Sequence, residues 1–177
     1  MAGLACFRFV ETNNNAMRTI FLRLTRPINL PFWWQDFLLL IPRLAAGYWL
    51  TSDFGAAKFG MPWSPADNNL GLFEVAYWFP HDVAQYGSIF ALFPGFFAWM
   101  AAFSEAVGGL AWMLGFQTRL FSFLIACTMI VAAFVQHAHE ELWQQLPAIG
   151  FGWLAIVHLI LGSGRFGMDY LISKKLS

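Results

Sequence analysis

The chain has 177 residues, of which 59% are hydrophobic and only 11% are charged. Soluble domains carry about 25% charged residues, so this chain has too few charges to cover a surface that faces water, and its composition predicts a membrane protein. Ten Lys and Arg residues balance ten Asp and Glu residues, which excludes the positive field that attracts nucleic acids. The two cysteines, Cys6 and Cys127, lie far apart without CxxC or metal-ligand spacing, which excludes a dithiol centre and a zinc-finger-like site.

Residues 1–34 form a predicted cytoplasmic tail. No apolar signal core precedes a cleavage site, so no cleavable signal is expected. The apolar residues from position 17 onward recur at helical spacing with arginines between them, namely Met17, Ile20, Phe21 and Leu24. This pattern favours a short amphipathic helix in the headgroup layer, which Pro27 ends. The alternative is a disordered tail.

Four segments are expected to cross the membrane, because a span needs about 20 largely apolar residues. The first begins near Phe37 and contains Arg43. The other three are residues 87–114, 120–136 and 146–163. Residues 35–177 are therefore predicted to form an all-α, four-helix membrane bundle, with neighbouring helices antiparallel because the second and third connections are short.

The distribution of Lys and Arg predicts the orientation. Arg119 joins the second and third spans, and further basic residues flank the two ends of the bundle, whereas the loops at 60–86 and 137–145 contain none. Lys and Arg in short loops mark the cytoplasmic side. Both termini are therefore expected in the cytoplasm, with the protein in the cytoplasmic (inner) membrane of a prokaryote.

Ionisable side chains inside the predicted spans are the candidate functional residues, because each costs at least about 2.5–3.5 kcal/mol to insert. Arg43 and Glu105 are predicted at similar depths, roughly 10–14 Å from the cytoplasmic end at 1.5 Å per residue, and are expected to pair. His158, at roughly 7–8 Å, is expected to join them. Gly108 and Gly109 follow Glu105 and leave room beside it for a second helix or a flat ligand.

Two interpretations of this cluster stay open. In the first, Arg43 and Glu105 form a salt bridge that fixes two spans in register, and the glycines are helix contacts. In the second, the cluster holds a polar headgroup, for which a quinone is the best candidate, with Arg43 or His158 as hydrogen-bond donor and Glu105 as proton donor. The Glu105→Gln variant keeps the fold under the second interpretation and lowers the amount of folded protein under the first.

Polar residues outside the spans give weaker signals. Asp53 and Lys58 are expected to pair locally or to line an outer mouth. The segment HAHEE follows the third span, and its candidate metal ligands are His137, His139 and Glu141. Two neighbouring ligands on one helical turn make only half a metal site, so a solvated loop is expected instead. The sequence shows no haem, flavin or iron–sulfur motif.

Four motifs occur in a fixed order along the chain. They are an Arg, a Gly and a Lys at 43, 47 and 58, SExxGG at 104–109, LGxxTR at 114–119 and GxGRxxxD at 162–169. In this order they resemble the DoxX family of small four-helix bacterial membrane proteins over residues 37–172. The resemblance implies a polar core of Arg43, Glu105 and Arg119, with Arg165 and Asp169 as an i, i+4 pair at the cytoplasmic end.

The resemblance also implies a function. Members of the family include the membrane subunit of an archaeal thiosulfate:quinone oxidoreductase, and others are linked to complexes that handle thiols and oxidative stress. The expected function is an integral membrane subunit that passes electrons from a thiol, sulfur or related donor to the quinone pool. Its expected catalytic residues are Glu105, Arg43 and His158, with Gly108, Gly109 and Arg119 around the quinone.

Two alternatives stay open beside this function. The first is a non-catalytic accessory subunit, whose aromatic-rich faces pack against a larger membrane complex. The second is a small-molecule carrier, although four spans offer little room for inverted repeats and a central cavity. The expected partners are the lipid bilayer and other subunits or a redox partner, and whether the chain is itself an enzyme stays open.

Overall fold

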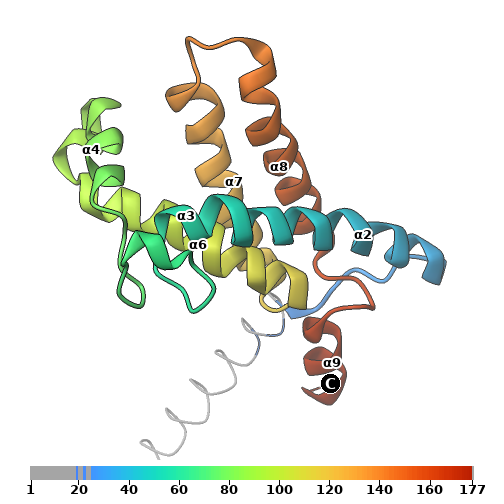
Figure 1. Cartoon of the computed structure of the whole chain (residues 1–177). Helices are drawn as coiled ribbons and strands as arrows, with labels where there is room; N and C mark the ends of the chain where they lie inside the picture. Colours follow the sequence, from blue (N-terminus) through green and yellow to red (C-terminus); the bar gives the residue numbers. More distant parts are fainter. Residues whose placement is uncertain (1–18, 20–21, 23–24, 177) are drawn as a thin grey trace, which may run out of the picture.

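The computed structural model of the chain describes residues 19, 22 and 25–176 (Figure 1). Within these residues the structure is helical, and its extended pairing is limited to one isolated bridge between Phe59 and Val75. The predicted all-α class is therefore confirmed for the described part of the chain. The predicted headgroup-layer helix near residues 17–24 lies outside the described residues, apart from positions 19 and 22.

The first long helical element runs without a break from Trp33 to Lys58. It consists of α2 (Trp33–Trp49), the π-helical segment η1 (Leu50–Gly55) and the short α3 (Ala56–Lys58). Its last residue, Lys58, is the basic residue of α3. A π-helical turn is rare and occurs frequently at functional sites.

Three described helices are long and apolar enough to cross a membrane. They are α6 (Pro94–Leu114), α7 together with the π-helical η3 (Thr118–Gln136), and α8 (Leu142–Leu161). The last three predicted spans are thus confirmed as candidate membrane helices, and the protein is an integral membrane protein by this criterion. The first predicted span is not among them, so it and the orientation of the termini stay predictions.

Shorter helices connect and flank the long ones. They are η2 (Ala66–Asn68), α4 (Trp78–Gln85), α5 (Ser88–Leu92) and α9 (Met168–Leu176). The predicted span at 87–114 is divided between α5 and α6, because Phe93 leaves the helical conformation and Pro94 starts a new helix as its first residue. Proline is favoured at that position, where its missing N–H has no helical partner.

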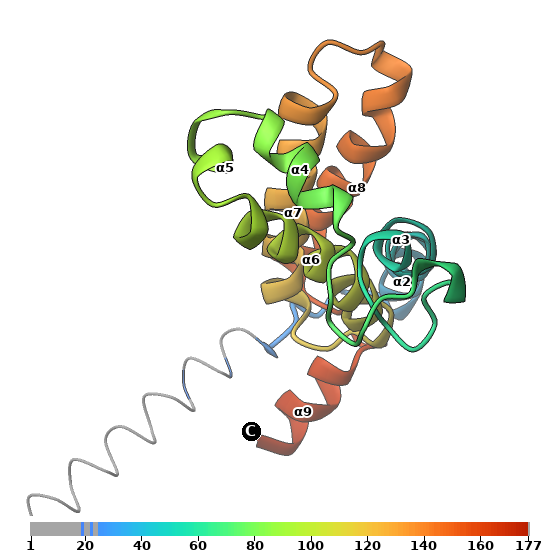
Figure 2. The ribbon, with the colours of Figure 1, turned by 60° about the vertical axis from the view of Figure 1, so that its left-hand side comes forward.

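The long helices pack against one another in chain order: α2 contacts α6, α6 contacts α7, and α7 contacts α8. Glycines bring α2 and α6 very close, since a Cβ atom on Gly47 would lie 2.7 Å from the Gly109 carbonyl oxygen. Figures 1 and 2 show α7 and α8 side by side, rising from the level at which α2 and α6 pass each other. The buried core surrounds Trp112, whose indole N–H donates to Ser122 Oγ at 2.7 Å.

A second buried cluster lies beneath α4, which packs on α6. Its centre is Phe59, with no exposed surface, and its α4 members are Phe79 and Val83. This contact joins the segment at 60–86, predicted as an outer loop, to the membrane helices. The cluster determines where one wall of the functional site lies.

Candidate functional site

Glu105 forms an ion pair with Lys58. The Lys58 Nζ atom lies 2.8 Å from Glu105 Oε2 and 3.1 Å from Oε1, so it donates to both carboxylate oxygens. The side chain of Glu105 is 5% exposed and that of Lys58 is 18% exposed. The predicted pairing of Glu105 with Arg43 is wrong.

The register between the first helical element and α6 explains this partner. The two helices are antiparallel: a Cβ on Gly47 would approach Gly109, whereas Thr51 Oγ1 donates to the Ala106 carbonyl at 3.1 Å. Gly55 also lies against Ala106, and the side chain of Lys58, three residues further along, contacts Glu105. Arg43 instead lies at the other end of α6, beside Gly115, which follows Glu105 by ten residues and therefore by about 15 Å along the helix.

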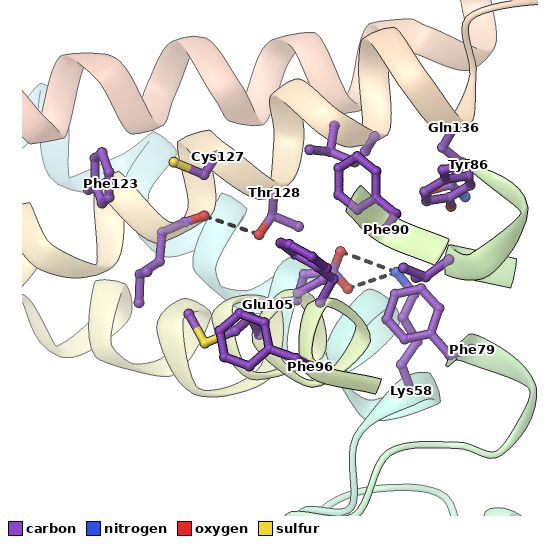
Figure 3. A pocket seen from close by; sticks show the side chains of 17 residues that line it. Lys58, Phe79, Tyr86, Phe90, Phe96, Glu105, Phe123, Cys127, Thr128 and Gln136 are labelled. Carbon is purple, nitrogen blue, oxygen red and sulfur yellow. Dashed lines mark hydrogen bonds and ion pairs between the residues drawn. The ribbon is translucent and has the colours of Figure 1, made fainter. Parts of the chain in front are cut away.

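The ion pair lines an apolar cavity of about 340 Å³ (Figure 3). This volume falls within the range of about 300–1,000 Å³ that is usual for small-molecule sites. The walls come from α4, α5, the first half of α6, and α7 with η3, and most of them are aromatic or aliphatic. The apolar lining includes Phe79, Val83, Phe90, Phe96, Phe97, Met100, Phe123 and Val131.

Few polar groups face this cavity besides the ion pair. The Lys58 ammonium lies 5.0 Å from the centroid of the Phe79 ring, a cation–π distance. Tyr86 also lines the cavity, and burial, followed by the charges of Asp82 and Glu105, raises the pKa of its phenol to about 12. Tyr86 is therefore a neutral hydrogen-bond donor at physiological pH.

Arg43 is buried in a second polar cluster. Its guanidinium donates to the backbone carbonyls of Ser163 and, at 2.9 Å, Phe166. Beside it, the Asp169 carboxylate accepts the backbone N–H groups of Gln117 and Thr118, both at 2.8 Å. These contacts tie α2, the start of α7 and the turn before α9 together, and we refer to Arg43, Asp169 and the backbone groups that they bind as the latch.

Arg165 belongs to this end of the molecule but does not pair with Asp169. Its Nε atom lies 3.3 Å from Asp36 Oδ2, and its Nη2 atom donates to the Leu30 carbonyl at 2.9 Å. The predicted i, i+4 pair between Arg165 and Asp169 is wrong, because Arg165 lies in the turn before α9 begins at Met168. Asp36, which is almost fully buried, was not singled out by the sequence analysis.

The remaining predicted site residues lie apart from Glu105. His158 is buried, with its ring 5.2 Å from that of Trp112 and its Nδ1 atom 2.9 Å from the Leu154 carbonyl oxygen. Arg119 donates to the Ile160 carbonyl at 3.1 Å. Neither residue lines the Lys58–Glu105 cavity.

The two glycines of the SExxGG motif face neighbouring helices. A Cβ atom on Gly108 would lie 3.4 Å from the Phe121 ring in α7, and one on Gly109 would lie 2.4 Å from Thr51 Oγ1 in η1. Gly109 thus permits the close contact with the first helical element. That contact is part of what brings Lys58 to Glu105.

The HAHEE segment forms a turn. His137 Nδ1 lies 2.5 Å from Glu140 Oε2, an i, i+3 contact, whereas Glu141 is the residue that precedes α8. Residues 137–140 form a turn and not a helix, in agreement with the expected loop, so His137 and Glu141 do not share a helical turn. Among the described residues, no three His, Cys, Asp or Glu side chains lie close enough together to hold a metal ion. His139 therefore has no metal-binding partners in this part of the chain.

Lys58 and Tyr86 are the functional candidates that the sequence analysis placed least well. Lys58 was expected to line an outer mouth or to pair with Asp53, and it does line the cavity, but its partner is Glu105. The place of Lys58 in the motif of Arg43, Gly47 and Lys58 was the feature of the sequence that indicated a functional role. Tyr86 carried no signal, because it lies in a segment predicted only as a loop.

Comparison with known proteins gives one result. A family model described as DoxX matches residues 38–138, which is more than half of the chain. The match includes Arg43, Lys58 and Glu105 and ends before Arg165 and Asp169. No curated protein and no solved structure matches the chain.

Proposed function

This chain belongs to the DoxX family and is an integral membrane protein, and from that premise we propose that it is the membrane subunit of a quinone-linked redox system. The observation that carries the proposal is the Lys58–Glu105 ion pair, which is largely buried and faces an apolar cavity. A pair of ionisable groups in a concave, largely apolar site is a candidate for ligand binding and proton transfer.

The charge of the pair indicates what kind of headgroup fits. Lys58 and Glu105 together have no net charge, so a charged headgroup would leave one uncompensated charge in an apolar site. A neutral headgroup with hydrogen-bond acceptors avoids that penalty. An ammonium has three N–H groups, and the two contacts with Glu105 leave one to donate to a ligand carbonyl.

The aromatic walls fit the same class of ligand. Phe79, Phe90 and Phe97 line the cavity, and aromatic side chains pack against flat rings with offset or edge-to-face geometry. The phenol of Tyr86 offers a further neutral donor. A quinone ring, which is flat, uncharged and rich in carbonyl oxygens, matches these properties.

Each polar residue then has a distinct role. Lys58 binds a carbonyl oxygen through its free N–H. Glu105, which is ionised in the pair, relays the two protons that the reduced ring needs, taking up each one from water and passing it on. A bound quinone supplies an acceptor for two electrons and two protons. The electrons come from a partner oxidoreductase that oxidises a thiol, a sulfur compound or a related donor.

Arg43 and His158, first considered for the quinone site, have a structural role in this proposal. Arg43 is occupied by two backbone carbonyls in the latch, and His158 packs on Trp112. Neither side chain faces the cavity that Glu105 lines. Substitutions there are expected to affect folding before they affect ligand binding.

The test is quinone binding by the purified protein in mild detergent. We expect wild-type protein to bind decylubiquinone, and Lys58→Met and Glu105→Gln to weaken that binding at least tenfold. Asp53→Asn is the matched control, because Asp53 is an exposed carboxylate that lines a different groove. The proposal fails if wild-type protein neither retains nor binds a quinone, or if all four proteins bind it equally.

A non-catalytic accessory subunit is the second candidate, and the exposed aromatic surface favours it. Phe134, Trp143 and Trp153 are each at least 65% exposed, and such side chains suit lipid or a partner subunit equally. This candidate predicts that the chain is recovered from native membranes at fixed stoichiometry inside a large complex. It also predicts that the complex keeps its activity when Lys58 and Glu105 are replaced by uncharged residues, provided that the complex assembles.

A further inference from the structure

We propose that the cavity opens sideways into the bilayer between α6 and α7, and that the lipid tail of its ligand leaves there, past Phe96, Phe123 and Cys127. This inference rests on the proposed function, because it takes the headgroup to lie at the Lys58–Glu105 pair. It adds the route of entry and the requirement for a tail, and therefore restricts the ligand to a lipid-soluble class.

The cavity has a polar end and an apolar end. Figure 3 shows Lys58, Phe79 and Glu105 on one side and Phe123 and Cys127 on the other, with Thr128 between them. Thr128 Oγ1 is already engaged, since it donates to the Leu124 carbonyl at 3.1 Å and lies 2.7 Å from Ser104 Oγ. The end near Phe123 and Cys127 thus offers an apolar surface and little hydrogen bonding.

Three residues of the cavity lining are exposed to the exterior as well as to the cavity. Phe96 is 61% exposed, Phe123 is 53% exposed, and Cys127 is also exposed, while all three line the cavity. Phe96 belongs to α6 and the other two to α7, which are both candidate membrane spans. An opening between two membrane spans faces acyl chains and not water.

The contacts between α6 and α7 lie from the middle of α6 onward, away from its start. Ser104 and Thr128 are in hydrogen-bond contact, and further along α6 a Cβ on Gly108 would meet Ile125 at 3.5 Å. Toward the start of α6, the cavity separates it from α7, and α4 with α5 forms the opposite wall. Phe79 and Val83 of α4 are almost fully buried and close that wall.

The volume of the cavity requires the tail to leave. About 340 Å³ lies near the lower limit of small-molecule sites, so a substituted quinone ring fills it. A long isoprenoid chain does not fit beside the ring. The opening at Phe96, Phe123 and Cys127 lets such a chain continue into the bilayer, where its apolar surface remains out of water.

The experiment compares a tailed and a tailless quinone on purified protein. Decylubiquinone and duroquinone both have fully substituted rings, so neither adds a thiol at a free ring position. Cys127→Trp fills the opening, and Ile130→Trp is its control, because Ile130 is exposed on α7 and lines a different groove. We expect Cys127→Trp to weaken decylubiquinone binding at least tenfold and duroquinone binding less than twofold, and Ile130→Trp to change neither.

The outcomes separate this inference from the proposed function. If wild-type protein binds neither quinone, the proposed function fails and this inference with it. If both quinones bind wild-type protein but Cys127→Trp leaves decylubiquinone binding unchanged, the proposed function stands and the tail route is overturned.

A measurement on the wild-type protein covers the case in which Cys127→Trp loses both ligands. A quinone with a photoreactive diazirine at the end of its tail is crosslinked in liposomes, and the modified peptides are identified by mass spectrometry. Labelling around Phe96 and Phe123 supports the route. Labelling confined to the groove between α2 and α8, at Trp49 and Phe151, overturns it.

Discussion

The Lys58–Glu105 pair makes a quantitative prediction about stability. Lys58→Met leaves the Glu105 carboxylate, only 5% exposed, without its cation. Glu105→Leu leaves the Lys58 ammonium, which is 18% exposed and lies 5.0 Å from the centroid of the Phe79 ring in the present structure. The two variants should therefore differ, and loss of the lysine should be the more destabilising.

The burial of the pair gives the magnitude. Exposed ion pairs contribute about 0–1 kcal/mol, whereas removing one partner of a buried pair costs about 3–5 kcal/mol. Glu105 lies close to the buried limit, so we expect Lys58→Met to lower the free energy of unfolding by about 3 kcal/mol. We expect about 1–2 kcal/mol for Glu105→Leu, and a double variant within about 1 kcal/mol of wild type, because it leaves no uncompensated charge.

The assay is a double-mutant cycle. Unfolding by denaturant in detergent is followed through the nine tryptophans, and Asp53→Asn is the control, with an expected change below about 0.5 kcal/mol because its carboxylate is exposed. A coupling energy of about 3–5 kcal/mol is expected, which is the sum of the two single effects less the effect of the double variant. If the single effects add to within about 0.5 kcal/mol, the two charges do not interact in the folded protein and the reasoning is refuted.

Three further predictions follow from other contacts. Asp169→Ala leaves two buried amides at the start of α7 without an acceptor and should lower the free energy of unfolding by about 2 kcal/mol in the same assay. Gly55→Ala places a Cβ 2.5 Å from the Ala106 Cα and should cost about 1–3 kcal/mol, whereas Gly95→Ala, with open space around its Cβ, should be neutral. The phenol of Tyr86, whose pKa is raised to about 12, should ionise after an ordinary tyrosine at about 10. The folded protein then binds more protons than the unfolded chain between those values, so stability falls as pH rises through them, and a Tyr86→Phe difference titration at 295 nm checks the pKa.

The sequence predicted the long helices well because their signals are local. The predicted third span, 120–136, corresponds to a helix over Thr118–Gln136, and the predicted fourth, 146–163, to Leu142–Leu161. Length and continuous apolar composition determine such segments, and both are properties of neighbouring residues. The break at Phe93 is harder to predict, because a proline at position 94 is compatible with a kink or with a new helix start, and the structure has a new start.

The partners of the buried charges were predicted less well because they depend on register. Burial of Arg43 was expected, but its partners are backbone carbonyls of the turn after α8, and a backbone acceptor leaves no mark in the sequence. The depth estimate for Glu105 ignored where α2 begins relative to the end of α6. Arg43 lies about ten residues, or about 15 Å, further along α6 than Glu105, and this difference was enough to make Lys58 the partner of Glu105 in place of Arg43.

The cavity itself was outside the reach of the sequence analysis. Its aromatic wall comes from α4 and α5, within and after a segment predicted as an outer loop. That wall is positioned by long-range packing, with Phe59 beneath Phe79 and Val83. Only the tertiary structure brings these side chains to the same place as Lys58.

The two polar clusters differ in what satisfies their charges, and this difference separates structure from function. In the latch, Arg43 binds carbonyls in the turn after α8 and Asp169 binds amides at the start of α7, so each charge compensates backbone groups that have no partner within a helix. A ligand could bind these charges only by replacing the backbone contacts that hold the fold together. Lys58 and Glu105 bind each other beside a cavity, so a ligand can share their hydrogen bonds while the helices stay in place.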